Sequence, residues 1–336
     1  MCTAAAATED FEIQDITGHF NLSLLKTFNM YFLTKYVIVT IPAQINFCME
    51  VGLLPTTRTC TYCKKRLNLT AEKRPDHATP VVYRCYNSKC KHYNKYISVR
   101  DRTVFAESKL SIDTILRLMV LYVNRITSYE QLRTECVDES GKELSTETIS
   151  DWLTYLREVQ LEALVEITKD KIGGPNCTVE IDESKFGKRK YNKGRVIEGQ
   201  WVIGGICREN GDIFVALCPE NKRDAETLMT IIENHVDNRS TVITDCWKAY
   251  DHLEQKKWHH LTVNHSTNFI DPSTGAHTQN IENTWWQMKR NLPSTHGGNL
   301  MLHFAQYLWQ RKFVTKGQQP HLTFLSHVKK LYPGRK

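Results

Sequence analysis

The chain has 336 residues, of which 41% are hydrophobic and 24% are charged. This composition is typical of a globular protein and excludes a disordered or fibrous chain. The formal net charge of +7 is a mild excess, so the position of the basic residues is more informative than their number. The length predicts about two domains.

The first residues and the cysteines indicate where the chain is found. The first twenty residues carry four acids and lack the basic start and apolar core of a signal peptide. We therefore expect a chain that is not secreted, nuclear if eukaryotic and otherwise cytoplasmic, whose eleven cysteines are reduced or bind metal. The apolar run 30–45 is interrupted by Lys35 and Pro42 and is shorter than the roughly 20 residues that a bilayer-spanning helix needs.

Residues 1–55 are expected to be a helical lead-in, in which the run 30–45 is a buried helix or strand. Residues 56–105 are short-stranded, basic and rich in turns, and they contain two cysteine pairs, Cys60-x2-Cys63 and Cys85-x4-Cys90. Two such pairs, separated by a strand-length segment, can place four thiolates tetrahedrally around zinc. The segment therefore predicts a small zinc ribbon. Four unrelated cysteines, or His92 as a ligand, are the alternatives.

Residues 106–172 have the apolar periodicity of helices, with Ser111 and Ser145 as predicted N-caps. A helix, a short helix, a turn and a longer helix match a helix-turn-helix-like DNA-binding unit. Three-helix units without a ligand are also common. The preceding segment 58–102 holds twelve Lys or Arg against three acids, which favours a polyanionic partner over a merely solvated basic face.

Residues 173–320 change to strands. Three strands are predicted at 177–183, 200–207 and 212–218, followed by a helix at 224–235, strands at 241–244 and 261–264, with a short helix at 247–253 between them, and helices at about 277–292 and 299–315. This order predicts an α/β fold with a mixed sheet flanked by helices, as in ribonuclease H. Residues 321–336 are expected to be a basic tail.

Three acids fall at the ends of these predicted elements. Asp182 lies in the first strand, Asp245 ends the fourth, and Glu282 lies early in a helix. Because the first and fourth strands of such a sheet are neighbours, the acids can converge. Clustered carboxylates bind Mg²⁺, and two ions about 4 Å apart can catalyse in-line phosphoryl transfer. Each acid alone is more often an exposed cap or turn residue.

Basic and aromatic residues accompany the acids. Lys188, Arg189 and Lys190 lie in a hairpin without acids, and Lys289 and Arg290 lie near the end of the helix that carries Glu282. These five are predicted to contact the DNA backbone, although Lys289 could equally be a surface residue favoured by the helix dipole. One member of the Trp pair 285–286 is predicted to stack on a displaced base. A transition-metal site of His259, His260, His265 and His277 is a weaker alternative.

The ordered motifs resemble those of the Merlin transposases and of the related bacterial insertion-sequence transposases. They are 180–183 (Glu-Ile-Asp-Glu), 244–250 (Thr-Asp-Cys-Trp-Lys-Ala-Tyr), 263–266 (Val-Asn-His-Ser), 269–272 (Phe-Ile-Asp-Pro), 275–278 (Gly-Ala-His-Thr), 280–282 (Asn-Ile-Glu) and Trp285. The resemblance covers residues 60–311 and includes the cysteine segment. Arg102, where a Gly is usual, and the wide Cys85–Cys90 pair depart from it.

The resemblance implies a DDE transposase that performs cut-and-paste DNA transposition. Asp182, Asp245 and Glu282 would hold two Mg²⁺ or Mn²⁺ ions, Lys289 matches the family's basic residue, and the Cys60, Cys63, Cys85 and Cys90 site would hold structural zinc. The partners would be transposon terminal repeats, target DNA and further copies of the chain. The alternatives are a host-adopted, non-catalytic DNA-binding protein or transcription regulator, and a nuclease acting on RNA–DNA hybrids.

Overall fold

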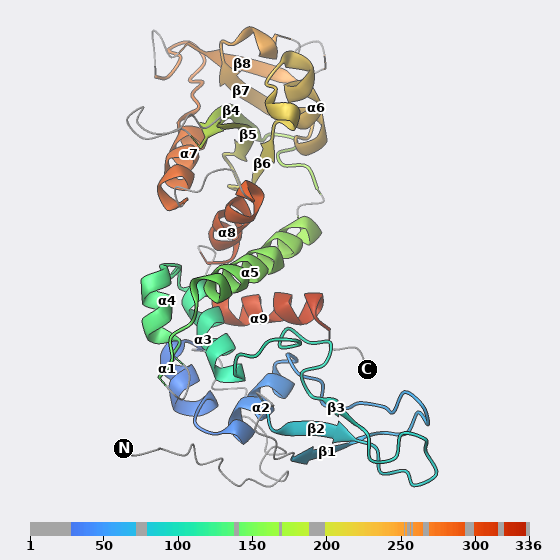
Figure 1. The fold of residues 1–336 in the computed structure, drawn as a ribbon. Coiled ribbons are helices and arrows are strands. Elements are labelled where there is room, and N and C mark those ends of the chain that lie inside the picture. The colour runs from blue at the N-terminus through green and yellow to red at the C-terminus, as the bar shows by residue number, and fades with distance from the viewer. Residues whose placement is uncertain are drawn as a thin grey trace. The chain divides into compact units, whose positions relative to one another are not determined.

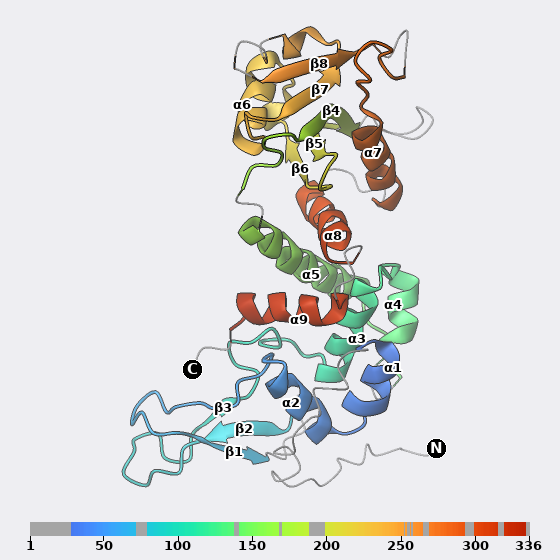
Figure 2. The same ribbon diagram turned by 180° about the vertical axis from the view of Figure 1, so that it is seen from behind.

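The computed structural model describes residues 28–71, 79–137, 141–167, 170–187, 199–251, 253, 256, 258–264, 269–292, 299–314 and 319–333. The chain divides into two compact units. The first comprises Met1–Glu162 and Arg311–Lys336, and the second comprises Ala163–Gln310. Figures 1 and 2 show the elements of each unit from opposite sides. No helix among the described residues is both long and apolar enough to cross a membrane.

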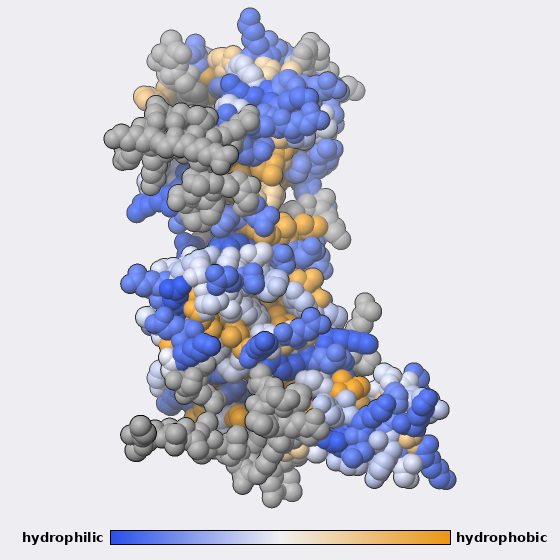
Figure 3. Space-filling model, viewed as in Figure 1, coloured by the Kyte–Doolittle hydropathy of each residue, from blue (hydrophilic) through white to orange (hydrophobic). Residues whose placement is uncertain are grey.

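The cysteine segment of the first unit forms a small antiparallel sheet. Its strands are β1 (Asn68–Ala71), β2 (Val81–Arg84) and β3 (Tyr96–Ser98), in the order β1-β2-β3. The middle strand supplies the buried side chains, because Val81, Val82 and Tyr83 are all nearly inaccessible. Figure 3 shows one face of this sheet and its loops, and most of the side chains on that face are hydrophilic. Such a sheet buries little apolar surface, so its stability must come largely from another source.

The helices of the first unit follow the predicted order. The apolar run 30–45 is helical, since it contains α1 (Met30–Phe32), a π-helical turn (Leu33–Val37) and the start of α2 (Ile41–Glu50). Gly52, at a φ of +80°, then ends the helical path. The predicted three-helix unit consists of α3 (Ile112–Val123), α4 (Tyr129–Glu135) and α5 (Thr146–Ile167). The Ser111 and Ser145 hydroxyls accept the backbone N–H groups of Thr114 and Thr148, as predicted for N-caps.

The end of the chain differs from the expected basic tail. Residues Pro320–Leu331 form α9, whose Phe324, Leu325 and Val328 are buried. The Phe324 ring lies 5.8 Å from the Tyr122 ring of α3, and the His321 imidazole is 2.9 Å from the side-chain oxygen of Asn124. The apolar residues are spaced three and four apart, which is the pattern of a helix with one buried face. The basic residues 329–330 lie in its last turn.

The second unit is built on a five-stranded sheet in the order β6-β5-β4-β7-β8. The strands are β4 (Thr178–Phe186), β5 (Gln200–Cys207), β6 (Ile213–Leu217), β7 (Thr241–Asp245) and β8 (His259–Val263). The first three pair antiparallel, whereas β7 joins β4 in parallel and β8 joins β7 in parallel. This is the mixed sheet of ribonuclease H-like proteins, so the predicted fold class is confirmed.

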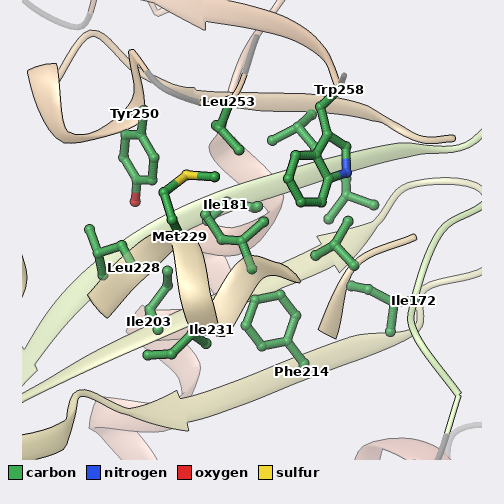
Figure 4. Packing of buried hydrophobic residues seen from close by; sticks show 14 of the residues in the cluster. Ile172, Ile181, Ile203, Phe214, Leu228, Met229, Ile231, Tyr250, Leu253 and Trp258 are labelled. Carbon is green, nitrogen blue, oxygen red and sulfur yellow. The ribbon is translucent and has the colours of Figure 1, made fainter. Parts of the chain in front are cut away.

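Each face of this sheet is covered by helices. On one face, α6 (Ala225–His235) packs on a core that includes Ile181, Ile203 and Trp258 (Figure 4). On the other face, α7 (Gln279–Asn291) and α8 (Leu300–Phe313) pack against Phe186 and its neighbours. Successive residues of a strand point to opposite faces, so β4 sends 179 and 181 to α6 and 180, 182 and 186 to α7. The acid Asp182 therefore shares its face with the helix that carries Glu282.

Candidate active site and metal centres

The pairing of β4 with β7 brings two of the predicted acids to the same level of the sheet. Glu180 is opposite Ile243, so continuing this parallel register by two residues aligns Asp182 with Asp245. Asp245 is the last residue of β7, and its Oδ1 accepts the backbone N–H of Trp247 at 3.0 Å. This bond orders the turn that follows the strand. The carboxyl end of the central parallel pair thus carries two acids.

Helix α7 adds the third acid and contacts the first. Glu282 lies in its first turn, and Glu282 Oε1 accepts a hydrogen bond from the Thr278 hydroxyl at 2.8 Å. One turn later, Trp285 Nε1 donates to Asp182 Oδ2 at 3.1 Å. The indole can reach over the sheet because residue 204 is glycine. A Cβ there would lie 2.6 Å from the Trp285 ring, closer than non-bonded atoms can approach.

A buried carboxylate fixes α7 to β4. Glu180 is fully inaccessible, and its Oε2 accepts the backbone N–H groups of Asn280 and Ile281 at 2.9 and 3.2 Å. Glu180 Oε1 accepts from the Asn280 side chain at 2.7 Å and from Arg208 Nε at 2.6 Å. Arg208 also donates to the carbonyl oxygen of His277 at 2.7 Å. An acid at a helix N-terminus is favoured by the exposed N–H groups and the helix dipole.

This Glu180 clamp, formed by Glu180, Arg208 and Asn280, sets the spacing of the site. Glu180 is two residues from Asp182 on β4, and Asn280 is two residues from Glu282 on α7. The clamp therefore fixes the position of Glu282 relative to Asp182. None of the three clamp residues is predicted as a site residue from the sequence. An acid two positions from Asp182 on the same strand face was the signal that could have identified the clamp.

The charge environment of Asp182 shows that the acids influence one another. Burial raises the pKa of Asp182 to about 7, and the negative charges of Glu183, Asp245 and Glu282 contribute to the rise. Glu183 lies on the opposite face and receives a hydrogen bond from the Tyr250 hydroxyl. Burial likewise raises the pKa of Glu183. A cation placed among these carboxylates would relieve both the burial penalty and the repulsion.

The three acids are near enough for Asp245 and Glu282 to affect the pKa of Asp182, but their oxygen atoms do not form one compact group. Among the described residues, they do not form a set whose ligand atoms all lie within 4.8 Å. Two ions about 4 Å apart, each with oxygen ligands about 2.1 Å away, would separate the outermost carboxylate oxygens by up to roughly 8 Å. Carboxylates that share two ions therefore need not all lie within 4.8 Å of one another.

The predicted basic and aromatic residues of α7 differ in the rings that they contact and in their exposure to solvent. Lys289 Nζ is 5.3 Å from the centre of the Phe186 ring, and the Arg290 guanidinium is 5.3 Å from the Trp286 ring. Trp286 is 59% exposed, whereas Trp285 is buried against Asp182. Of the pair, Trp286 is therefore the one whose ring is open to solvent. The predicted contacts Lys188, Arg189 and Lys190 lie outside the described residues.

The four predicted cysteines come together. Cys60 Sγ is 3.7 Å from Cys90 Sγ, Cys63 Sγ is 3.9 Å from Cys85 Sγ, and all four sulfurs lie within 4.8 Å of one another. Four sulfurs each 2.3 Å from a tetrahedral zinc ion would be about 3.8 Å apart. His92 is not in this set, and its Nδ1 is 3.4 Å from the Thr61 hydroxyl. The donor set therefore fits zinc.

The histidine alternative finds no support among the described residues, and one of its four members, His265, lies outside them. His259 Nδ1 and His260 Nε2 lie 3.1 and 2.9 Å from the Thr241 and Thr244 hydroxyls. Neither belongs to a group of potential metal ligands among the described residues. The second such group is instead Cys177, Cys207 and Glu209, in which the Cys207 thiol donates to the Glu209 carboxylate at 3.3 Å.

A segment that includes the second unit matches a known protein family. Residues 161–314 match the family described as the ISXO2-like transposase domain. An uncharacterized transposase-like protein of Haemophilus influenzae is 35% identical over 82 residues, which are 24% of this chain and 64% of that protein. The chain thus spans just under two thirds of the length of this relative.

Several solved structures resemble parts of the chain. The HTLV-2 integrase catalytic core domain in complex with magnesium is 17% identical, with 41% of this chain and 86% of that chain covered and a TM-score of 0.22. The Mos1 strand transfer complex is 12% identical, with coverage of 65% and 71% and a TM-score of 0.26. The Drosophila P element transposase strand transfer complex is 11% identical, with coverage of 65% and 63% and a TM-score of 0.25.

Proposed function

Since residues 161–314 match the ISXO2-like transposase domain, we propose that the chain is a DDE transposase that cuts and joins DNA strands. The observation that supports the proposal is that Asp182 lies near both other acids, since burial and the charges of Glu183, Asp245 and Glu282 raise its pKa. Hard oxygen donors of this kind bind Mg²⁺ or Mn²⁺. When bound, such ions activate the attacking oxygen and stabilise the leaving oxygen of a phosphodiester.

The chain's own residues would orient this chemistry. Trp285 holds one oxygen of Asp182, Thr278 holds one oxygen of Glu282, and the Glu180 clamp keeps the two acids at a fixed spacing. In-line phosphoryl transfer needs no covalent enzyme intermediate, so no Ser or Tyr nucleophile is assigned. Lys289 and Arg290, together with residues 188–190, would contact the DNA backbone beside the acids.

The first unit would dock the DNA. We assign structural zinc to Cys60, Cys63, Cys85 and Cys90, because their sulfurs have the spacing of a tetrahedral site. The α3–α5 unit and the basic cysteine segment would bind the terminal repeats. Cut-and-paste transposition requires two DNA ends to be held together, so we expect a homo-oligomer.

The test is strand cleavage and joining by the full chain on DNA taken from the ends of its element. With Mg²⁺ or Mn²⁺, Asp182→Asn, Asp245→Asn and Glu282→Gln should each lower cleavage about a thousandfold, because each removes a metal ligand worth several kcal/mol in the transition state. The matched control is Glu226→Gln, an exposed acid on α6 that should cleave normally.

Three outcomes would contradict the proposal in different ways. Undiminished cleavage by the three variants would remove the acids from the catalytic site. DNA binding without any cleavage by the wild type would indicate a non-catalytic DNA-binding protein. Preferred cleavage of RNA–DNA hybrids over duplex DNA would indicate a ribonuclease H-like nuclease.

A further inference from the structure

Arg223 is held between elements of the sheet by aromatic contacts. Its guanidinium carbon lies 4.0 Å from the centre of the Trp201 ring and 4.6 Å from the centre of the Trp247 ring. Both distances are well within the range of cation–π attraction. Trp201 lies near the start of β5, and Trp247 follows Asp245 by two residues. The arginine is therefore attached to the same end of the sheet as the candidate catalytic acids.

The loop that leads to Arg223 is fastened to β5. The Asn221 side chain accepts the backbone N–H of Trp201 at 2.6 Å and donates to the carbonyl oxygen of Gly199 at 3.0 Å. On the other side, Asp224 caps α6 by accepting the backbone N–H of Thr227 at 2.9 Å. The backbone on both sides of Arg223 is thus fixed, and little conformational entropy remains to be lost when its side chain binds a ligand.

The aromatic contacts leave the polar part of Arg223 available. A guanidinium that packs on rings does so through its flat faces, whereas its N–H donors lie in the plane and remain free for a second partner. The residue is exposed, and within the described parts of the chain no hydrogen bond or ion pair involves its guanidinium. A planar fork of donors fixed in this way is the geometry that recognises a phosphate.

A second cation lies beside the indole that holds Arg223. Lys185, which pairs with Trp201 across the β4–β5 ladder, places its Nζ 5.5 Å from the same Trp201 ring. The two cations repel each other, and an anion bound by both would offset this repulsion. Of the acids near Arg223, Asp224 caps α6, and Glu183 receives a hydrogen bond from the Tyr250 hydroxyl while the charge of Arg223 lowers its pKa.

We propose that Arg223, with Lys185 beside it, binds a backbone phosphate of a DNA strand at the carboxyl end of the sheet. The inference rests on the proposed function for its ligand. It adds a binding site on the α6 side of the sheet, opposite the face on which Asp182 meets α7. Because the Trp247 backbone N–H is bonded to Asp245, the indole that holds Arg223 and the acid belong to one turn. A strand bound here would lie at the carboxyl end of β7, where Asp245 is the last residue.

The test is equilibrium binding of duplex DNA by the full chain over a series of salt concentrations, with Ca²⁺ replacing Mg²⁺ so that no strand is cut. Removal of one phosphate contact lowers the slope of log affinity against log salt by about 1. Arg223→Gln should show this loss and bind about tenfold more weakly at low salt. Arg223→Lys keeps the charge but not the planar fork, so it should bind more weakly with an unchanged slope.

Arg239→Gln is the matched control. Arg239 is exposed, lies before the amino end of β7 and pairs with Asp237, so its variant should keep the wild-type slope. Equal slopes and affinities for Arg223→Gln, Arg239→Gln and the wild type would overturn the inference and leave the proposed function intact. Absence of DNA binding by the wild type would overturn both. If Arg223→Gln does not fold, wild-type affinity in Arg223→Lys would be the contradicting result.

Discussion

The two candidate metal centres are built in opposite ways. The four cysteines fall between positions 60 and 90, and their sulfurs already have the spacing of a zinc site, at 3.7 and 3.9 Å. The three acids extend from position 182 to position 282 and are not gathered within 4.8 Å. The cysteines are close in sequence and their sulfurs form one compact group. The acids are far apart in sequence, are brought near one another only by the tertiary structure, and do not form such a group.

The surroundings explain this difference. The cysteine segment has three strands of three or four residues, which cannot form a large core. The acids lie on a five-stranded sheet with a hydrophobic cluster on each face. We infer that the first centre needs its ion in order to fold, while the second is held by the protein and binds its ions reversibly.

The largest effect is expected from removal of zinc. Zinc contributes on the order of 10 kcal/mol to the folding of small cysteine domains, so a strong chelator or Cys60→Ser should unfold the segment 56–105. Limited proteolysis would then cut within this segment. Tryptophan fluorescence should change little, because the second unit contains six of the seven tryptophans, Trp201, Trp247, Trp258, Trp285, Trp286 and Trp309.

Cys246→Ser is the control for zinc removal. Cys246 is exposed and lies outside the four-sulfur group, so this variant should keep one zinc ion per chain and resist proteolysis. Retention of zinc by Cys60→Ser, or an intact segment without zinc, would show that the cysteine centre is not the stabilising element.

The next largest effect should come from Glu180→Gln. The variant leaves Arg208 without its charged partner, and in either orientation its amide NH₂ faces donors, either the backbone N–H groups of Asn280 and Ile281 or the side chains of Arg208 and Asn280. Removing one partner of a buried ion pair destabilises by about 3–5 kcal/mol. Urea unfolding followed by tryptophan fluorescence would measure the loss. Because the clamp spaces Asp182 and Glu282, the Mg²⁺ concentration needed for half-maximal cleavage should also rise.

Glu226→Gln again provides the comparison, since an exposed acid on α6 should change stability by less than about 0.5 kcal/mol. If Glu180→Gln were as stable as this control and required no more Mg²⁺, the clamp would not set the geometry of the acids. A loss of stability with an unchanged Mg²⁺ requirement would assign it a purely structural role.

These two centres also differ in how far the sequence predicts them. Cysteine spacing predicts the zinc ligands because the ligands are close in the chain and their chemistry is specific. The order of strands predicted the sheet, which the structure confirms, and hence the neighbouring positions of Asp182 and Asp245. The Glu180 clamp was not predicted, because residues 100 positions apart meet in it and a strand glutamate is ordinarily exposed.

Helix α9 was missed for a related reason. Its basic residues led to the prediction of a tail, whereas Phe324, Leu325 and Val328 become buried only when partners such as α3 are present. A short amphipathic helix is stabilised mainly by tertiary packing, which local patterns do not reveal.

A smaller effect is expected from Gly204→Ala. The added methyl would lie 2.6 Å from the Trp285 ring and 2.9 Å from the carbonyl oxygen of Phe214, so the indole or the sheet must move. Overpacking of this kind destabilises by about 1–3 kcal/mol. The displaced indole would also release Asp182, and cleavage should fall more than stability alone explains. Gly211→Ala is the control, because it replaces a glycine outside the site. A Cβ at position 211 would have no atom within 4 Å, so the only cost is that of an alanine at a φ of +70°.

The smallest effect has the opposite sign and concerns Asp182→Asn in the absence of divalent metal. The wild type buries a carboxylate near Glu183, Asp245 and Glu282, which raises the pKa of Asp182 to about 7. The folded state therefore binds this proton more tightly than the unfolded chain, so wild-type stability falls as the pH rises toward and through 7. At about pH 8, Asp182→Asn should be more stable by about 1–2 kcal/mol, because the amide removes the charge but is still desolvated.

This gain should shrink as the pH falls below 7, because protonated Asp182 then resembles Asn, and it should also shrink when Mg²⁺ is added to the wild type. Urea unfolding with tryptophan detection at several pH values, with chelator and with Mg²⁺, would measure both trends. If the difference in unfolding free energy between the two proteins did not depend on pH, folding would not raise the pKa of Asp182. If Mg²⁺ stabilises the wild type but not Asp182→Asn, the fold holds the carboxylates close together at a cost in stability that the ions offset. The cysteine centre is the opposite case, because there the ion stabilises the fold.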